Sequence, residues 1–162
     1  MKQKKICLLG AFSVGKTSLI AQFVSSMFDE KYLTTVGVKV DKKVMAVGNE
    51  DLQLMIWDLA GEDDYSELQT NYLRGSAGYI LVADGTRPRS LETMRSINFK
   101  AKSTLGNKPH VLALNKADLT DQWALGDDVI SEVTDEFKTF LTSAKTGQNV
   151  EELFRTLAED ML

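Results

Sequence analysis

Short apolar runs alternate with longer amphipathic segments along most of this chain. Each apolar run ends in Gly, Asp or Asn, and a segment with helical spacing of its apolar residues follows most of them. Strands that alternate with helices are typical of β/α units around a parallel sheet. The expected strands are residues 5–10, 52–58, 79–84 and 111–115. The expected helices are residues 17–25, a short one near 67–73, residues 91–105 and a weak one near 127–133.

Two further segments complete the expected sheet. Residues 39–47 alternate in character and meet the second strand across a polar turn, which predicts an antiparallel hairpin at the sheet edge. Residues 139–142 are expected to form a last strand, followed by a helix from about Val150 with Asn149 as its cap. We therefore expect an α/β fold with a six-stranded, mostly parallel sheet, flanked by helices on both faces, in a single domain over residues 1–162.

The composition narrows the class of protein. The 162 residues are 43% hydrophobic with a net charge of −4, so no general positive field attracts nucleic acid or an anionic membrane. One cysteine, Cys7, and one histidine, His110, exclude a disulfide framework and a Cys/His zinc site. No apolar stretch approaches the roughly 20 residues of a membrane helix, and no direct membrane anchor is visible. We expect a cytoplasmic protein.

The most specific motif lies between the first expected strand and the first expected helix. Residues 10–17 have the sequence GAFSVGKT and fit the phosphate-binding pattern G-x-x-x-x-G-K-[ST]. Successive backbone N–H groups would face a phosphate, Lys16 would add charge at the terminal phosphates, and Thr17 would offer a hydroxyl to Mg²⁺. The expected nucleotide contacts are Ser13, Val14, Gly15, Lys16, Thr17 and Ser18. A glycine-bearing turn that caps a helix is the alternative.

Three further segments follow this loop along the chain. They are residues 57–62 (WDLAGE), 115–118 (NKAD) and 143–145 (SAK). With the phosphate-binding loop, they resemble the Ras superfamily of small GTPases, most nearly its Rab branch, and the resemblance covers nearly the whole chain. The Rab-like character rests on Trp57 and on residues 71–75, NYLRG. The resemblance implies GTP or GDP as the ligand, with Mg²⁺.

The resemblance also implies how the base is held. Asp118 would accept two hydrogen bonds from guanine, whereas adenine has no donor at either place and would leave the carboxylate unpaired. The stem of Lys116 would lie on the base, and Asn115 would tie this segment to the phosphate-binding loop. The other implied base contacts are Ser143, Ala144, Lys145 and the aromatic Phe28. A place in the core is the alternative for Phe28.

Magnesium and the terminal phosphate have their own implied residues. Asp58 ends an apolar strand and suits a Mg²⁺-bound water, because this hard cation prefers oxygen ligands. Thr17 and Thr35 would supply hydroxyls to the same ion. The backbone N–H groups of Thr35 and Gly61 would meet the γ-phosphate, so that loss of this phosphate would release both loops.

Two departures from the family concern catalysis. The implied catalytic residues are Lys16, Thr35, Gly61 and Glu62. Glu62 stands where the family has the glutamine that orients the attacking water. Phe12 stands where relatives have a small residue, in the path of an arginine finger, an interaction worth roughly 10³–10⁵ in rate. We expect slow intrinsic hydrolysis and an activating protein that works without a standard arginine finger.

The expected function is that of a GTP-hydrolysing molecular switch. GTP with Mg²⁺ would order residues 31–38 and 61–73, and effector, exchange-factor and GTPase-activating proteins would bind these loops. Three alternatives stay open. They are a non-hydrolysing GTP-binding module, the GTPase domain of a larger signalling protein, and a P-loop kinase or ATPase, which Asp118 disfavours. Outside the site, Arg87 is expected in a solvated turn.

Overall fold

A six-stranded sheet forms the centre of the protein in the computed structural model, which describes residues 1–25, 38–59 and 70–162. The strands run in the order β2-β3-β1-β4-β5-β6, and all neighbours are parallel except the antiparallel pair of β2 and β3 at one edge. The strands are β1 (Lys2–Gly10), β2 (Val38–Val47), β3 (Glu50–Leu59), β4 (Ser76–Asp84), β5 (His110–Asn115) and β6 (Thr139–Leu141). The predicted fold class and edge hairpin are confirmed.

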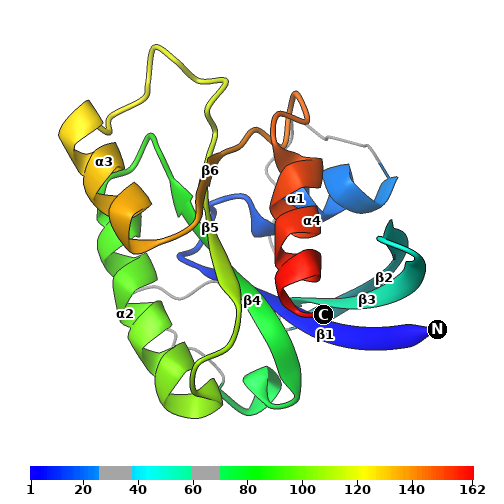
Figure 1. The fold of residues 1–162 in the computed structure, drawn as a ribbon. Helices are drawn as coiled ribbons and strands as arrows, with labels where there is room; N and C mark the ends of the chain where they lie inside the picture. Colours follow the sequence, from blue (N-terminus) through cyan, green and yellow to red (C-terminus); the bar gives the residue numbers. More distant parts are fainter. Residues whose placement is uncertain (26–37, 60–69) are drawn as a thin grey trace.

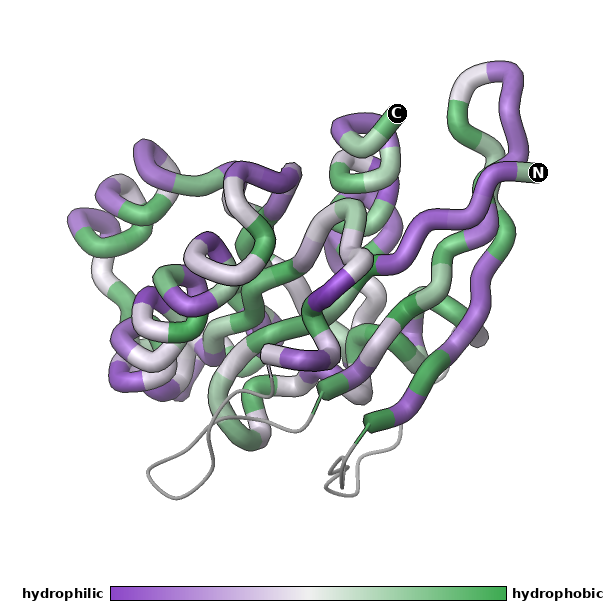
Figure 2. The backbone as a smooth tube through the Cα atoms, turned by 90° about the horizontal axis from the view of Figure 1, so that it is seen from below, coloured by the Kyte–Doolittle hydropathy of each residue, from purple (hydrophilic) through white to green (hydrophobic). Residues whose placement is uncertain are grey.

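Helices cover both faces of this sheet (Figure 1). On one face α1 and α4 enclose a core with Ile6, Leu8 and the stacked rings of Phe23 and Phe154, whose centroids lie 3.9 Å apart. On the other face α2, α3 and η1 enclose the second core. The helices are α1 (Lys16–Ser25), η1 (Thr70–Leu73), α2 (Arg89–Leu105), α3 (Asp127–Glu136) and α4 (Val150–Asp160). The hydrophobic colouring follows the inner strands, while the first residues of β1 are hydrophilic (Figure 2).

Several predicted boundaries shift. Strand β1 begins at Lys2 because its first residues pair along β3, from Lys2 beside Leu52 onward. The helix expected near 67–73 is a short 3₁₀ turn in its described part, and α3 runs on to Glu136. Asn149 does precede α4, but with φ 56° it adopts a left-handed conformation and caps nothing with its side chain. Instead, that side chain donates to the Leu141 carbonyl at 2.8 Å, so Asn149 occupies the predicted cap position of α4 without making a capping side-chain bond.

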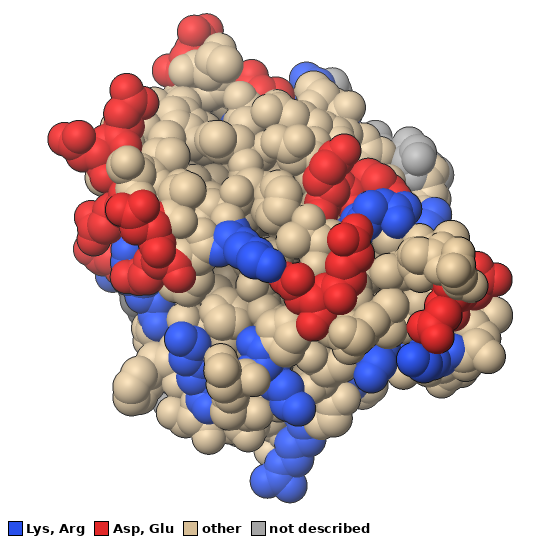
Figure 3. Space-filling model, in the orientation of Figure 1, with Lys and Arg blue, Asp and Glu red and all other residues tan. Residues whose placement is uncertain are grey.

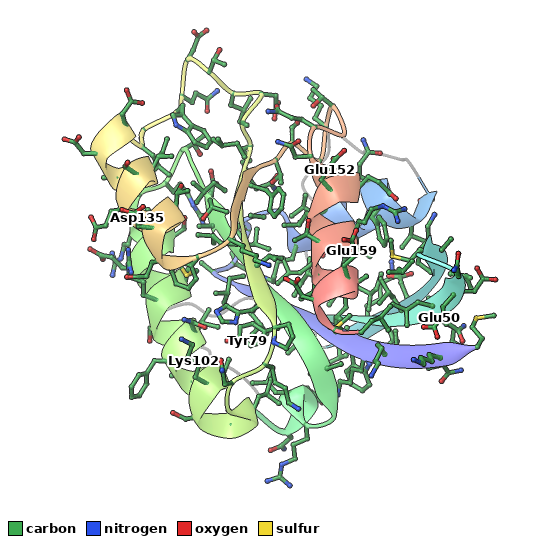
Figure 4. All side chains as sticks on the ribbon, viewed as in Figure 1. Glu50, Tyr79, Lys102, Asp135, Glu152 and Glu159 are labelled. Carbon is green, nitrogen blue, oxygen red and sulfur yellow. The ribbon has the colours of Figure 1, made fainter. Side chains whose placement is uncertain are left out.

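The second core contains one buried phenol. Tyr79 on β4 is fully buried, stacks on the His110 ring at 4.8 Å and donates to Asn98 on α2 at 2.8 Å. Figure 4 shows Tyr79 between the sheet and this helix. Burial raises the pKa of Tyr79 to about 12. His110 starts β5, and Cys7 is buried in β1. Among the described residues, no helix combines the length and hydropathy needed to cross a membrane.

Candidate functional site

The loop between β1 and α1 is held in place by side chains that donate to its backbone carbonyls. Lys16, the first residue of α1, donates through Nζ to the carbonyls of Gly10 at 3.1 Å and Ala11 at 3.0 Å. Arg87, just before α2, donates through Nη2 to the Phe12 carbonyl at 2.7 Å. These bonds turn the first three carbonyls of the loop towards side chains.

Two residues after β5 continue this pattern. Lys116 donates through Nζ to the Ser13 carbonyl at 3.1 Å, and Asn115 donates through Nδ2 to the Val14 carbonyl at 3.0 Å. The carbonyls of residues 10–14 are thus all bound by side chains. Because the N–H of each trans peptide is antiparallel to the preceding carbonyl, these bonds also fix the directions of the N–H groups of residues 11–15. Successive N–H groups of such a loop can form a concave anion-binding surface.

Gly15 is required by the geometry of this loop. Its φ is 104°, a left-handed conformation that favours glycine. A Cβ added there would lie 2.2 Å from Asn115 Nδ2, the atom that holds the Val14 carbonyl. Ser13 also has a positive φ, 65°, so left-handed residues alternate with others in the loop. The sequence pattern of glycines therefore reflects both backbone conformation and close packing against β5.

Lys16 is a buried cation at the centre of this arrangement. Its side chain reaches back along the loop, and the residue is only 6% exposed. The pKa of Lys16 is lowered from 10.5 to about 8, chiefly by burial; the nearby Asp58 carboxylate opposes this shift, and the positive charge of Arg87 adds to it. A bound polyanion would favour the charged form of this ammonium, because an opposite charge stabilises it.

Two oxygen ligands lie together beside the loop. Thr17 Oγ1 donates to Asp58 Oδ2 at 2.6 Å, and Asp58 is 1% exposed at the end of β3. A hydroxyl and a carboxylate side by side are the oxygen donors that Mg²⁺ prefers. The residues present therefore fit this ion, and they are two of the three predicted metal ligands.

The segments predicted to hold a base lie beside one another. Ser143 Oγ donates to Asp118 Oδ1 at 2.8 Å and accepts from the Thr146 N–H at 3.1 Å. Thr142 Oγ1 donates to Asn115 Oδ1 at 3.0 Å, so Asn115 links this region to the phosphate-binding loop. Asp118 stays half-buried, while Ala144 is buried and Lys145 is exposed. Residues 115–118 and 143–145 thus form one connected surface.

One buried acid was missed by the sequence reasoning. Asp84, at the end of β4, is fully buried, and its Oδ2 lies 2.9 Å from Lys116 Nζ and 3.5 Å from Arg87 Nε. Its Oδ1 accepts from the N–H of Thr86 at 2.8 Å. Arg87 lies in a turn with its side chain exposed, as predicted, and the same side chain also joins this acid to the Phe12 carbonyl, which the sequence did not predict. An Asp at the end of an inner strand, as at Asp58, was the available signal.

Several of the predicted site residues belong to segments outside the described part of the chain. Phe28, Thr35, Gly61 and Glu62 lie outside the described residues, as do most of the two loops expected to respond to nucleotide. Phe12 is described, and its side chain is 44% exposed while its carbonyl is held by Arg87. The described residues therefore bring together the phosphate-binding loop, the Thr17–Asp58 pair and the base-side segments.

Comparisons with known proteins place this site in a family. A family model described as the Ras family matches residues 5–162. The chain is 35% identical to the GTP-binding protein Rheb homolog of Dictyostelium discoideum, across 99% of this chain and 88% of that protein. It is 33% identical to the Ras-related protein Rab-13 of Canis lupus familiaris, across 98% of this chain and 79% of that protein. It is also 33% identical to the Ras-related protein Rab-31 of Rattus norvegicus, with 99% and 84% covered.

Proposed function

The chain belongs to the Ras family of small GTP-binding proteins, and on this basis we propose that it is a guanine-nucleotide switch that hydrolyses GTP slowly with Mg²⁺. The observation that carries the proposal is the continuous set of contacts from the phosphate-binding loop to the base side. Asn115 bonds both Val14 and Thr142, so one side chain joins the two halves of the site. A ligand with phosphates at one end and a base at the other fits this arrangement.

Each part of the ligand has its own residues in this proposal. The loop N–H groups and Lys16 bind the phosphates, and Asp118 and Ser143 select guanine. Thr17 and Asp58, with Thr35, hold Mg²⁺, which when bound offsets negative charge on the phosphates. Effector, exchange and activating proteins are proposed to bind residues 31–38 and 61–73.

In this proposal, the protein promotes hydrolysis by positioning the γ-phosphate and the attacking water. Water attacks the γ-phosphorus, the bond to the oxygen bridging the β- and γ-phosphates breaks, and GDP and phosphate leave. Lys16 stabilises the charge that accumulates on these oxygens. Glu62 can accept a hydrogen bond from the water, but unlike glutamine it adds negative charge near an anionic transition state. Phe12 is bulky and half-exposed at the loop, and in this proposal it blocks an arginine supplied by a partner.

The test is single-turnover hydrolysis of γ-labelled GTP with Mg²⁺. Wild type is compared with Glu62→Gln and with Phe12→Gly. Phosphate release from wild type, at a rate that either substitution changes, supports the proposal. Tight GTP binding without phosphate release would instead favour the second candidate, a non-hydrolysing GTP-binding module. The exposed Phe12 ring is the observation that favours this candidate. Competition by excess ATP serves as a control, because the proposal requires that ATP does not displace GTP.

A further inference from the structure

A second concave site lies at the other end of the sheet. A cavity of about 490 Å³ opens between the start of β1, the turn from η1 to β4 and the end of α2. Its basic lining residues include Lys5, Arg74 and Lys108, and we call it the basic cavity; Lys4 also borders it, but its side chain lies on the opposite face of the sheet because strand side chains alternate. No Asp or Glu of the described residues lines it. Its volume is typical of small-molecule sites, which span about 300–1,000 Å³.

The cations of the basic cavity differ in their pairing from several other basic side chains. Several basic groups elsewhere have carboxylate partners, as in Lys138–Asp160 at 2.7 Å and Arg155–Glu151 at 3.1 Å. Within the described residues, Arg74 and Lys108 have none. The positive charge in this cavity is therefore uncompensated, although the chain as a whole carries −4.

Lys5 is fixed in place without a carboxylate. Its Nζ donates to the Arg74 carbonyl at 2.8 Å and lies 3.8 Å from the centroid of the Trp57 ring. Both contacts keep the positive charge, since neither a carbonyl nor an aromatic ring carries a formal negative charge. One wall of the cavity thus presents a preorganised ammonium group.

The backbone is irregular where it borders the basic cavity. The pairing of β1 with β4 shifts between Lys5 and Ile6, from Ser76 to Gly78, so that Ala77 is an extra residue in β4. Such a bulge bends a strand and interrupts its ladder. Gly75, with φ 81°, turns the chain just before it. Figure 3 shows Lys and Arg gathered where α2 ends and β4 begins, and Asp and Glu over α3.

We propose that the basic cavity binds a compact polyanion that carries two or more phosphate groups. Several uncompensated cations around one concave surface favour a small ligand with multiple negative charges. A large partner with a flat surface would fit this shape less well. The cavity is separate from the phosphate-binding loop, because the five residues from Lys5 to Gly10 span about 16 Å of strand at ~3.3 Å per residue. The same chemistry is offered by a free phosphorylated metabolite and by the headgroup of a phosphorylated lipid.

The experiment uses the full chain with saturating GDP and Mg²⁺, so that the phosphate-binding loop is occupied. Calorimetry measures binding of soluble inositol trisphosphate. Sedimentation measures binding to phosphatidylcholine vesicles with and without phosphatidylinositol bisphosphate. Binding of the soluble probe supports a free metabolite, and binding to the phosphorylated vesicles alone supports a lipid headgroup. Binding of neither probe overturns the proposal.

Two double variants with equal changes in net charge locate the binding. Arg74→Glu/Lys108→Glu alters the basic cavity, and Lys39→Glu/Lys42→Glu alters exposed lysines of β2. We expect the first to weaken polyanion binding at least tenfold and the second to change it less than twofold. Equal weakening in both would overturn the proposal, because it would indicate a general effect of charge. GDP content is measured in every sample, so that a failure of the nucleotide site is detected separately.

Discussion

The two ends of the central sheet use positive charge in different ways. At the carboxyl end, Lys16, Arg87 and Lys116 each donate to a carbonyl of the phosphate-binding loop, and the last two also flank the buried Asp84. At the amino end, Arg74 and Lys108 line a cavity with no carboxylate partner among the described residues. The first arrangement fixes backbone geometry before a ligand arrives. The arrangement at the amino end leaves positive charge available to a ligand and does not prescribe the ligand's shape as closely as the phosphate-binding loop does.

Removal of Asp84 should have the largest effect on the carboxyl end. Asp84→Ala removes a fully buried carboxylate that accepts from the Thr86 N–H and hydroxyl and pairs with the partly exposed Lys116 and Arg87, and the loss of hydrogen bonds to a charged group costs about 1.5–3 kcal/mol. We expect a loss of that size in the free energy of unfolding, measured by urea denaturation. Asp160→Ala breaks the exposed pair with Lys138 and should cost about 1 kcal/mol or less. Similar losses in both variants would contradict this account.

Asp118→Ala should have the next largest effect, on nucleotide affinity. Two hydrogen bonds to a charged group, at about 1.5 kcal/mol each, correspond to a roughly hundredfold loss of GDP affinity. Fluorescent GDP titration measures it. ADP affinity should stay unchanged, because Asp118 offers adenine no bond. An equal loss for both nucleotides would indicate that the substitution only disturbs the fold around Ser143.

One arginine from each end of the sheet gives a matched comparison. Arg87→Ala removes the donor to the Phe12 carbonyl, and one charged hydrogen bond of about 1.5 kcal/mol predicts a roughly tenfold loss of GDP affinity. Arg74→Ala removes the same side chain from the basic cavity and should change GDP affinity less than twofold. Equal effects would show that the guanidinium acts through general charge and not through the loop.

The smallest expected effect is a pH dependence of the nucleotide-free protein. The pKa of Lys16 is lowered to about 8 in the fold, from an ordinary 10.5. Between these values the unfolded chain binds more protons than the folded one, so stability should rise with pH. We expect the melting temperature to increase from about pH 8 to about pH 9.5 relative to Lys16→Met. Lys108→Met should keep the wild-type rise, and a flat wild-type profile would refute the shift.

The sequence predicted the fold and most of the described site because both depend on local patterns. Apolar runs that end in Gly, Asp or Asn placed Gly10, Asp58 and Asn115 at the carboxyl ends of neighbouring strands in the sheet, where the structure has them. The loop from 10 to 17 needed only its own residues to be recognised. The predicted roles of Phe28 and of the catalytic residues Thr35, Gly61 and Glu62 stay predictions.

What the sequence did not predict depends on distant parts of the chain. Arg87 has no local feature that directs it to Phe12, because its position follows from the packing of the β4–α2 turn against the loop. Asn149 has the residue type of a helix cap, but its side chain reaches the end of β6 instead. The basic cavity joins three segments and a strand irregularity, none of which is visible as a motif.

The bonds that hold the phosphate-binding loop also have a consequence for how the protein folds. The donors from Arg87, Asn115 and Lys116 lie 75, 101 and 103 residues from the carbonyls they bind. Contacts of such sequence separation form late, because the intervening chain must first be ordered. During synthesis, the loop therefore acquires its binding shape only after most of the chain has been made. Nucleotide then acts as a ligand of the native state alone, so its cellular concentration contributes to the protein's lifetime.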